Sequence, residues 1–151
     1  MTIVVPIIDI FAGPGGLGEG FSQLKDDKLK FKIALSIEKD KHAHKTLELR
    51  AFYRQFDKAP NAYFDYLNGK IGREALYAVY PKQAEAAQAE AWQHEITEQG
   101  IEEVIDRAEK SLKNFKSQES VMIGGPPCQA YSMAGRSRMK TTNENFDQDP
   151  R

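Results

Sequence analysis

Residues 3–21 read IVVPIIDIFAGPGGLGEGF, and this stretch decides the fold. The apolar, β-branched run over residues 3–10 predicts a strand buried on both faces, as in a parallel sheet. A glycine-dense turn follows, and after it Leu17, Phe21 and Leu24 recur at helical spacing. The order strand, glycine turn, helix is typical of α/β sites that hold an anion or a nucleotide-like cofactor.

The next segments repeat the alternation of strand and helix. Residues 32–38, KIALSIE, predict a second strand that ends at Glu38, and residues 40–56 predict a helix with Asp40 as its N-cap. Residues 120–125, SVMIGG, return to the pattern of a buried strand. The sequence therefore predicts an α/β fold, the N-terminal half of a doubly wound, mostly parallel sheet.

The middle of the chain is less clearly patterned. Residues 62–67, AYFDYL, suggest a short third strand, and residues 72–81 a short helix that Pro81 stops. Residues 82–116 predict a long helical stretch interrupted near Gly100. Its second half has one apolar face, which we expect to pack on the sheet or on an inserted hairpin rather than on a partner. We interpret residues 1–151 as part of one domain, with a helical insertion over about residues 70–117.

Composition narrows the class of protein. The chain has 151 residues, of which 40% are hydrophobic and 28% charged, as in one globular domain. It has neither an apolar run of about 20 residues nor the pattern of a signal peptide, so we expect a cytoplasmic protein without membrane contact. A net charge of -1 does not by itself indicate nucleic-acid binding. The single cysteine, Cys128, excludes an internal disulfide and a multi-cysteine zinc site, and we expect no metal.

The glycine turn fits two cofactors. Gly13, Gly15 and Gly18 have the G-x-G-x-x-G spacing of a dinucleotide site, although such a turn also occurs without a ligand. Asp9 at the strand end favours a cationic group, such as the ammonium of S-adenosylmethionine, over a pyrophosphate. Glu38, 22 residues after Gly16, is placed to accept hydrogen bonds from ribose hydroxyls, which NAD and S-adenosylmethionine share.

A second turn, GGPPCQAYS at residues 124–132, presents the cysteine. Gly124 and Gly125 allow close backbone approach, and Pro126 and Pro127 end the strand and stiffen the loop. A lone cysteine is usually buried and inert, but Cys128 on such a turn is a candidate nucleophile. Because both turns leave the carboxyl ends of parallel strands, we expect a cofactor on the first turn to lie beside the thiol on the second.

These motifs resemble those of the DNA (cytosine-5)-methyltransferases. DIFAGPGGLGEGF is similar to the family's first motif, SIEKD to the second and GGPPCQAYS to the catalytic motif, in the family's order, over residues 5–40 and 120–138. The resemblance implies a Rossmann-like fold, S-adenosylmethionine as cofactor and double-stranded DNA with a flipped cytosine as substrate, in a restriction-modification system. Methylation of tRNA cytosine and a non-catalytic cofactor-binding or assembly module are the alternatives. The interpretation as an NAD dehydrogenase holds only if Cys128 has no catalytic role.

The resemblance also assigns roles to residues. Cys128 is the implied nucleophile, and Asp65 is a possible acceptor for the adenine amino group. Lys39 departs from the apolar or aromatic residue that the family often has beside the glutamate. The loop after the cysteine is implied to contact DNA through Gln129, Ser132, Arg136 and Arg138. The implied cofactor-binding residues are Asp9, Phe11, Ala12, Gly13, Gly15, Gly16, Glu38, Lys39, Asp65 and Pro126.

Later family motifs do not occur in these 151 residues. Among them are the Glu-Asn-Val motif, the Gln-x-Arg-x-Arg motif and the region that reads the target bases. We therefore expect the 151 residues alone to transfer methyl groups negligibly. We also expect the strand at 120–125 to form an apolar sheet edge that a complementing C-terminal polypeptide would cover.

Overall fold

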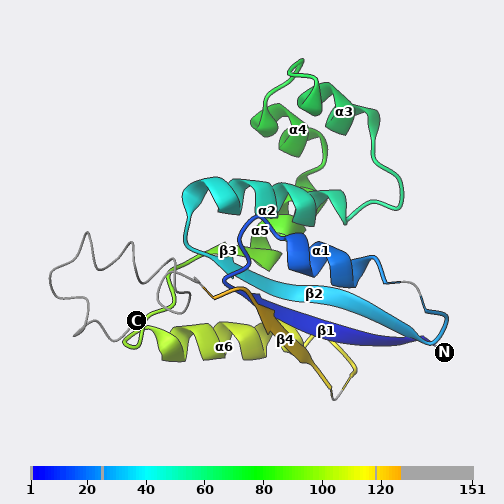
Figure 1. The fold of residues 1–151 in the computed structure, drawn as a ribbon. Helices are drawn as coiled ribbons and strands as arrows, with labels where there is room; N and C mark the ends of the chain where they lie inside the picture. Colours follow the sequence, from blue (N-terminus) through cyan, green and yellow to red (C-terminus); the bar gives the residue numbers. More distant parts are fainter. Residues whose placement is uncertain (1, 25, 118, 127–151) are drawn as a thin grey trace, which may run out of the picture.

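A parallel four-stranded sheet organises the protein. The structure is a computed structural model that describes residues 2–24, 26–117 and 119–126. The sheet has the order β3-β2-β1-β4, and all of its pairings are parallel. The α/β, Rossmann-like fold predicted from the sequence is confirmed (Figure 1). Its strands are β1 (Ile3–Ile10), β2 (Leu29–Glu38), β3 (Ala91–Gln93) and β4 (Val121–Gly124).

Helices cover both faces of this sheet. On one face α6 packs on Ile8, Leu35 and Ile37 through Val104. On the other face lie α1 and α2, and α2 packs against α4 and α5 around the fully buried Phe52 (Figure 1). None of the helices in the described ranges has the length and apolar character needed to cross a bilayer. The helices are α1 (Gly16–Ser22), α2 (Lys41–Tyr53), α3 (Asn61–Leu67), α4 (Arg73–Val79), α5 (Pro81–Glu90) and α6 (Ile101–Leu112).

Local signals account for the helix boundaries that were predicted. Asp40 accepts hydrogen bonds from the backbone N–H groups of His42 and Ala43, at 3.0 and 2.7 Å, and so caps α2 as expected. Pro81 follows α4 and also begins α5, where a missing N–H costs nothing. The helix from residue 101 is confirmed as a sheet-packing helix, although Ile101 and Ile105 of its apolar series remain exposed.

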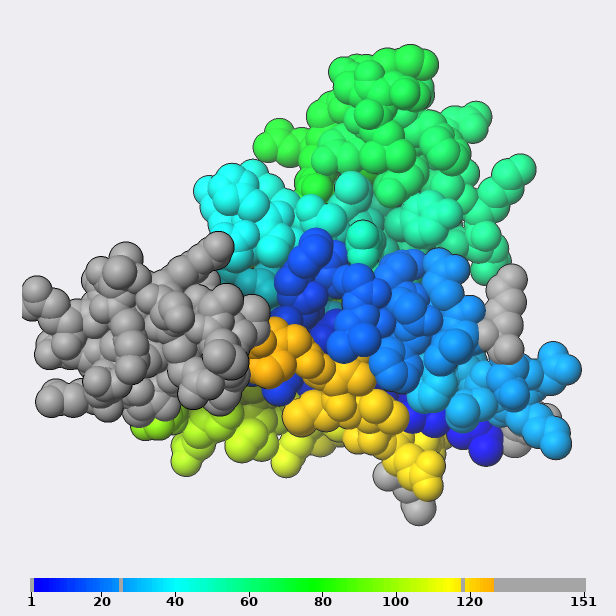
Figure 2. All heavy atoms as spheres, viewed as in Figure 1, coloured from blue at the N-terminus to red at the C-terminus, as the bar shows by residue number. Residues whose placement is uncertain are grey.

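Two predictions for the middle of the chain are wrong. Residues 62–67 are not a strand, because they belong to α3, which starts directly after Pro60. The third strand is instead β3, which interrupts the stretch that was predicted to be helical from residue 82. With only three residues, β3 is too short to show an alternating pattern. The helices α3 and α4 project away from the sheet, as the green atoms in Figure 2 show.

Candidate cofactor cleft at the carboxyl edge of the sheet

The turn after β1 depends on glycine at two positions. Gly13 and Gly15 have φ angles of +57° and +85°, in the left-handed region that side chains rarely adopt. Phe11 also has a positive φ, 53°, which is uncommon for a bulky residue and marks a constrained backbone. A Cβ on Gly15 would lie 2.7 Å from Leu47 Cδ1, so a side chain there would have to displace the Leu47 side chain of α2.

Glu38 connects this turn to the loop after β2. Its Oε2 accepts a hydrogen bond from the Gly13 N–H at 2.7 Å, and its Oε1 accepts one from the Asp40 N–H at 2.7 Å. A carboxylate oxygen can accept more than one hydrogen bond, so both oxygens keep capacity for a ligand hydroxyl. The predicted acid at the end of β2 is therefore held at the glycine turn by the protein backbone.

The two glycine turns leave neighbouring strands, as predicted. Ile10 of β1 is in register with Gly124 of β4. A Cβ on Gly124 would lie 2.5 Å from the Ile10 carbonyl oxygen, so only glycine fits there. Figure 2 shows this segment, in orange, against the blue atoms of the first turn. Pro126 is exposed at the end of the described chain, and Cys128, Gln129, Ser132, Arg136 and Arg138 lie outside the described residues.

A cleft of about 200 Å³ opens at this edge of the sheet. Four predicted residues contribute to its wall, namely Phe11, Gly13, Glu38 and Lys39. The wall is completed by Ile37, Gly125 and, directly after β3, by His94, Glu95 and Ile96. These last three were missed by the sequence analysis, because nothing marks a three-residue strand before them.

The residues after β3 are held in defined positions. The His94 ring stacks on Trp92, with ring centroids 4.0 Å apart, and the Arg107 guanidinium lies 4.5 Å from the Trp92 ring centroid. Glu95 forms an ion pair with Lys39 at 3.2 Å, but both side chains are more than half exposed. An exposed pair of this kind contributes little to stability and leaves Glu95 free to meet a ligand.

Asp9 and Ala12 lie behind the cleft rather than in its wall. The Asp9 side chain is 1% exposed and faces α1, where a Cβ on Gly18 would lie 2.9 Å from its Oδ2. Neither carboxylate oxygen of Asp9 has a hydrogen-bond partner among the described residues. Burial raises the pKa of Asp9 to about 6, against the opposing charge of Arg54. Ala12 is buried among α2, α4 and α5.

Asp65 does not approach the cleft. It lies on α3, half-exposed, where it pairs with Lys70 at 2.9 Å. The resemblance to the methyltransferase family implies a cofactor role for Asp65, and its position on α3 does not support that role. The third strand of the sheet is β3, and Glu95 is the carboxylate just after its end. Gly15 and Gly16 stand at the start of α1, just beyond the part of the turn that lines the cleft.

The parallel sheet, the glycine turn after β1 and the acid after β2 define an α/β protein of the Rossmann-like methyltransferase class. Residues 73–147 match the family of C-5 cytosine-specific DNA methylases. This match and the similarity to a curated methyltransferase described below confirm the resemblance seen in the motifs.

Two curated relatives are type II methyltransferases by name. The type II methyltransferase M.Bpa9945I of Bacillus paralicheniformis is 36% identical over 89% of this chain and 33% of its own length. The putative type II methyltransferase M.OihORF3336P of Oceanobacillus iheyensis is 29% identical over 95% of this chain and 22% of its own length. The chain thus spans a third or less of these relatives. No solved structure matches it significantly.

Proposed function

We propose that this chain provides the cofactor cleft and the nucleophile for methyl transfer from S-adenosylmethionine to C5 of cytosine in DNA, as part of a restriction-modification system. The observation that carries the proposal is the bond between Glu38 and Gly13. The Glu38 carboxylate accepts the Gly13 N–H at 2.7 Å, so its negative charge lies at the turn, where it opposes an anion and attracts a cation. A cofactor with a sulfonium and an ammonium group meets no such repulsion.

The residues around the cleft fit S-adenosylmethionine. A Cβ on Gly13 would meet no atom within 4 Å, so the backbone there is open to the methionine part. Glu38 would accept hydrogen bonds from the ribose, and Phe11 and Ile96 offer apolar surface to the adenine ring. Glu95, rather than Asp65, would accept a hydrogen bond from the adenine amino group. The bound cofactor supplies an electrophilic methyl group.

Cys128 would supply the nucleophile on the neighbouring turn. Its thiolate forms a bond to C6 of a cytosine that has left the helix, and the electron pair moves to C5, which becomes able to take up the methyl group. Loss of the C5 proton then expels the thiolate and restores the aromatic ring. Gln129, Ser132, Arg136 and Arg138 would hold the DNA, the two arginines through its phosphates.

Calorimetric titration tests the cofactor assignment. We expect S-adenosylmethionine and S-adenosylhomocysteine to bind the protein and NADH not to bind. Glu38→Ala should weaken S-adenosylhomocysteine at least tenfold, because it removes the ribose acceptor and loosens the turn. Glu74→Ala, an exposed residue of α4, is the matched control. Binding of NADH in preference to S-adenosylhomocysteine would overturn the proposal.

A chimera tests the chemistry. These 151 residues replace the matching part of the Bacillus paralicheniformis relative, and the chimera is incubated with cofactor and duplexes that contain 5-fluorocytosine, whose C5 fluorine cannot leave as a proton. We expect a covalent protein–DNA adduct that Cys128→Ser abolishes. An adduct with tRNA alone would support the tRNA alternative, and cofactor binding without any adduct would support a non-catalytic module.

A further inference from the structure

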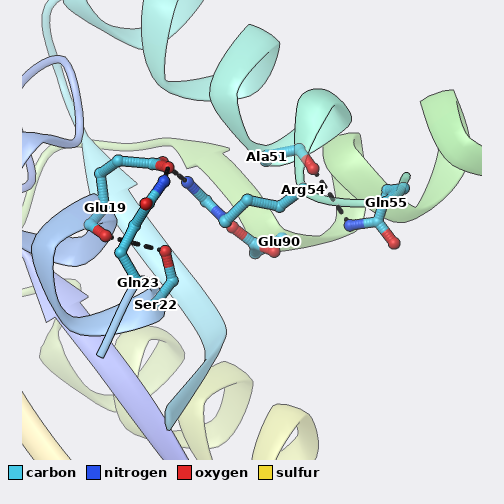
Figure 3. Close-up of polar contacts among 7 residues, drawn as sticks. All are labelled: Glu19, Ser22, Gln23, Ala51, Arg54, Gln55 and Glu90. Atoms are coloured by element: carbon cyan, nitrogen blue, oxygen red, sulfur yellow. Dashed lines mark hydrogen bonds and ion pairs between the residues drawn. The ribbon is translucent and has the colours of Figure 1, made fainter. Parts of the chain in front are cut away.

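A buried ion bridge lies behind the glycine turn. The guanidinium of Arg54, at the end of α2, donates to Glu19 Oε2 at 2.7 Å and to Glu90 Oε1 at 2.5 Å. The side chains are only 14%, 24% and 10% exposed, respectively. Figure 3 shows Arg54 between the two carboxylates, which come from different helices. We call Arg54, Glu19 and Glu90 the Arg54 bridge.

Each carboxylate of the bridge lies on a helix that is joined directly in sequence to one wall of the cleft or to the strand before it. Glu19 lies in the first turn of α1, a helix that begins directly after the glycine turn. Glu90 is the last residue of α5, and the next residue, Ala91, starts β3. The chain then runs through β3 into His94, Glu95 and Ile96 of the cleft wall. The bridge therefore connects two walls of the cleft from behind.

Other contacts also hold the wall after β3: the His94 N–H donates to the Glu38 carbonyl oxygen at 3.1 Å, and Trp92 and Ile96 pack on the cluster around Val104. β3 is an edge strand of the described sheet, and its parallel pairing with β2 spans only Ala91 to Gln93. His44 adds one contact between its ring Nε2 and the Ala91 carbonyl oxygen, at 3.0 Å. A guanidinium that binds two carboxylates restricts both in direction as well as in distance, which apolar packing does not.

We infer that Arg54 is a positioning residue that sets the separation between the glycine turn and the wall after β3, so that one ligand can engage both. This inference rests on the proposed function, in which the methionine part lies on the turn and the adenine against the second wall. Arg54 itself does not line the cleft. Its effect on binding passes through Glu19 on one side and Glu90 on the other.

Glu19→Ala is the sharpest perturbation. It frees α1 from the bridge and leaves the more deeply buried Arg54–Glu90 pair intact, so no buried charge loses its partner. Arg54→Met would isolate Glu90, whose pKa burial already raises, and is expected to unfold part of the protein. The double variant Arg54→Met/Glu90→Met removes both charges together and tests the same inference in a fold that keeps its packing.

Comparing the affinities of two ligands distinguishes a positioning role from a general loss of binding. S-adenosylhomocysteine spans both walls, whereas adenosine engages only the wall after β3 and Glu38. We expect Glu19→Ala to weaken S-adenosylhomocysteine about fivefold or more and to change adenosine affinity less than twofold. Glu19→Gln, which can still accept a hydrogen bond from Arg54, should restore much of the loss. Lys110→Ala, which breaks an exposed pair with Asp106 on α6, is the matched control.

A measurement without ligand keeps the inference separate from the proposed function. Amide hydrogen exchange at residues 91–96 should speed up in Glu19→Ala and in the double variant, and not in Lys110→Ala. Equal weakening of both ligands, or unchanged binding together with unchanged exchange, overturns the positioning role. If the unaltered protein binds no S-adenosylhomocysteine, the proposed function fails, and faster exchange at residues 91–96 would still show that the bridge positions this wall.

Discussion

Replacing Asp9 by asparagine should stabilise the protein, and more so at high pH. The Asp9 carboxyl is 1% exposed and without a hydrogen-bond partner among the described residues, and its pKa is raised from 3.8 to about 6 by burial. Since the native state holds the proton more tightly than the unfolded state, stability falls as pH rises from 3.8 to about 6. A shift of this size costs at most about 3 kcal/mol at neutral pH.

Asparagine keeps the shape of the side chain and removes the titration. The gain in unfolding free energy from Asp9→Asn should therefore be about 2 kcal/mol larger at about pH 8 than at about pH 4.5. For a chain of this size, that difference corresponds to roughly 4–8 °C in melting temperature. Thermal unfolding followed by circular dichroism at both pH values measures it, with Asp106→Asn, an exposed acid, as control. An equal effect of Asp9→Asn at both pH values would refute the reasoning.

Other predictions concern the α2 cap and two glycines. Asp40→Ala should lower the melting temperature at neutral pH. Because hydrogen bonds from the N–H groups of Ala43 and His42 hold the pKa of Asp40 below its ordinary value of 3.8, its contribution is present above that value and lost as pH falls through the lowered pKa, where the two proteins should converge. Gly13→Ala should cost only about 1–2 kcal/mol in denaturant unfolding, from its positive φ. Gly124→Ala should cost more, because its Cβ would lie 2.5 Å from the Ile10 carbonyl oxygen and separate β4 from β1, and a milder loss than for Gly13→Ala would contradict this packing.

The first 40 residues were predictable because their signals are local. A β-branched run, a glycine turn, a second apolar run and an Asp cap lie next to one another, and each needs only its own neighbours to form. The same locality explains why Glu38 could be placed at the end of β2. Its bond to the Gly13 N–H could not be predicted, because that contact joins residues 25 positions apart.

The second wall of the cleft depends on long-range contacts. β3 is a strand because Ala91, Trp92 and Gln93 pair with the end of β2, and not because their own sequence favours one. Because β3 could not be predicted, Glu95 was not identified as a cleft residue, and the acid that the resemblance assigns to the adenine, Asp65, lies on α3 instead. The position of Asp9 could not be predicted for a similar reason. A continuous apolar run does not show on which face of the strand its one carboxylate side chain lies.

The charges beneath α1 are better explained by geometry than by stability. An apolar residue in place of a buried ion pair is often neutral or stabilising, so Arg54 and Glu90 need not add to the free energy of unfolding. Asp9 lowers that free energy at neutral pH, because its pKa is raised. A guanidinium also adds direction, since Nη1 of Arg54 donates to Glu19 and Nη2 donates to Glu90 within one rigid plane. Apolar side chains at the same positions would let α1 and α5 slide, and the two walls of the cleft would move with them.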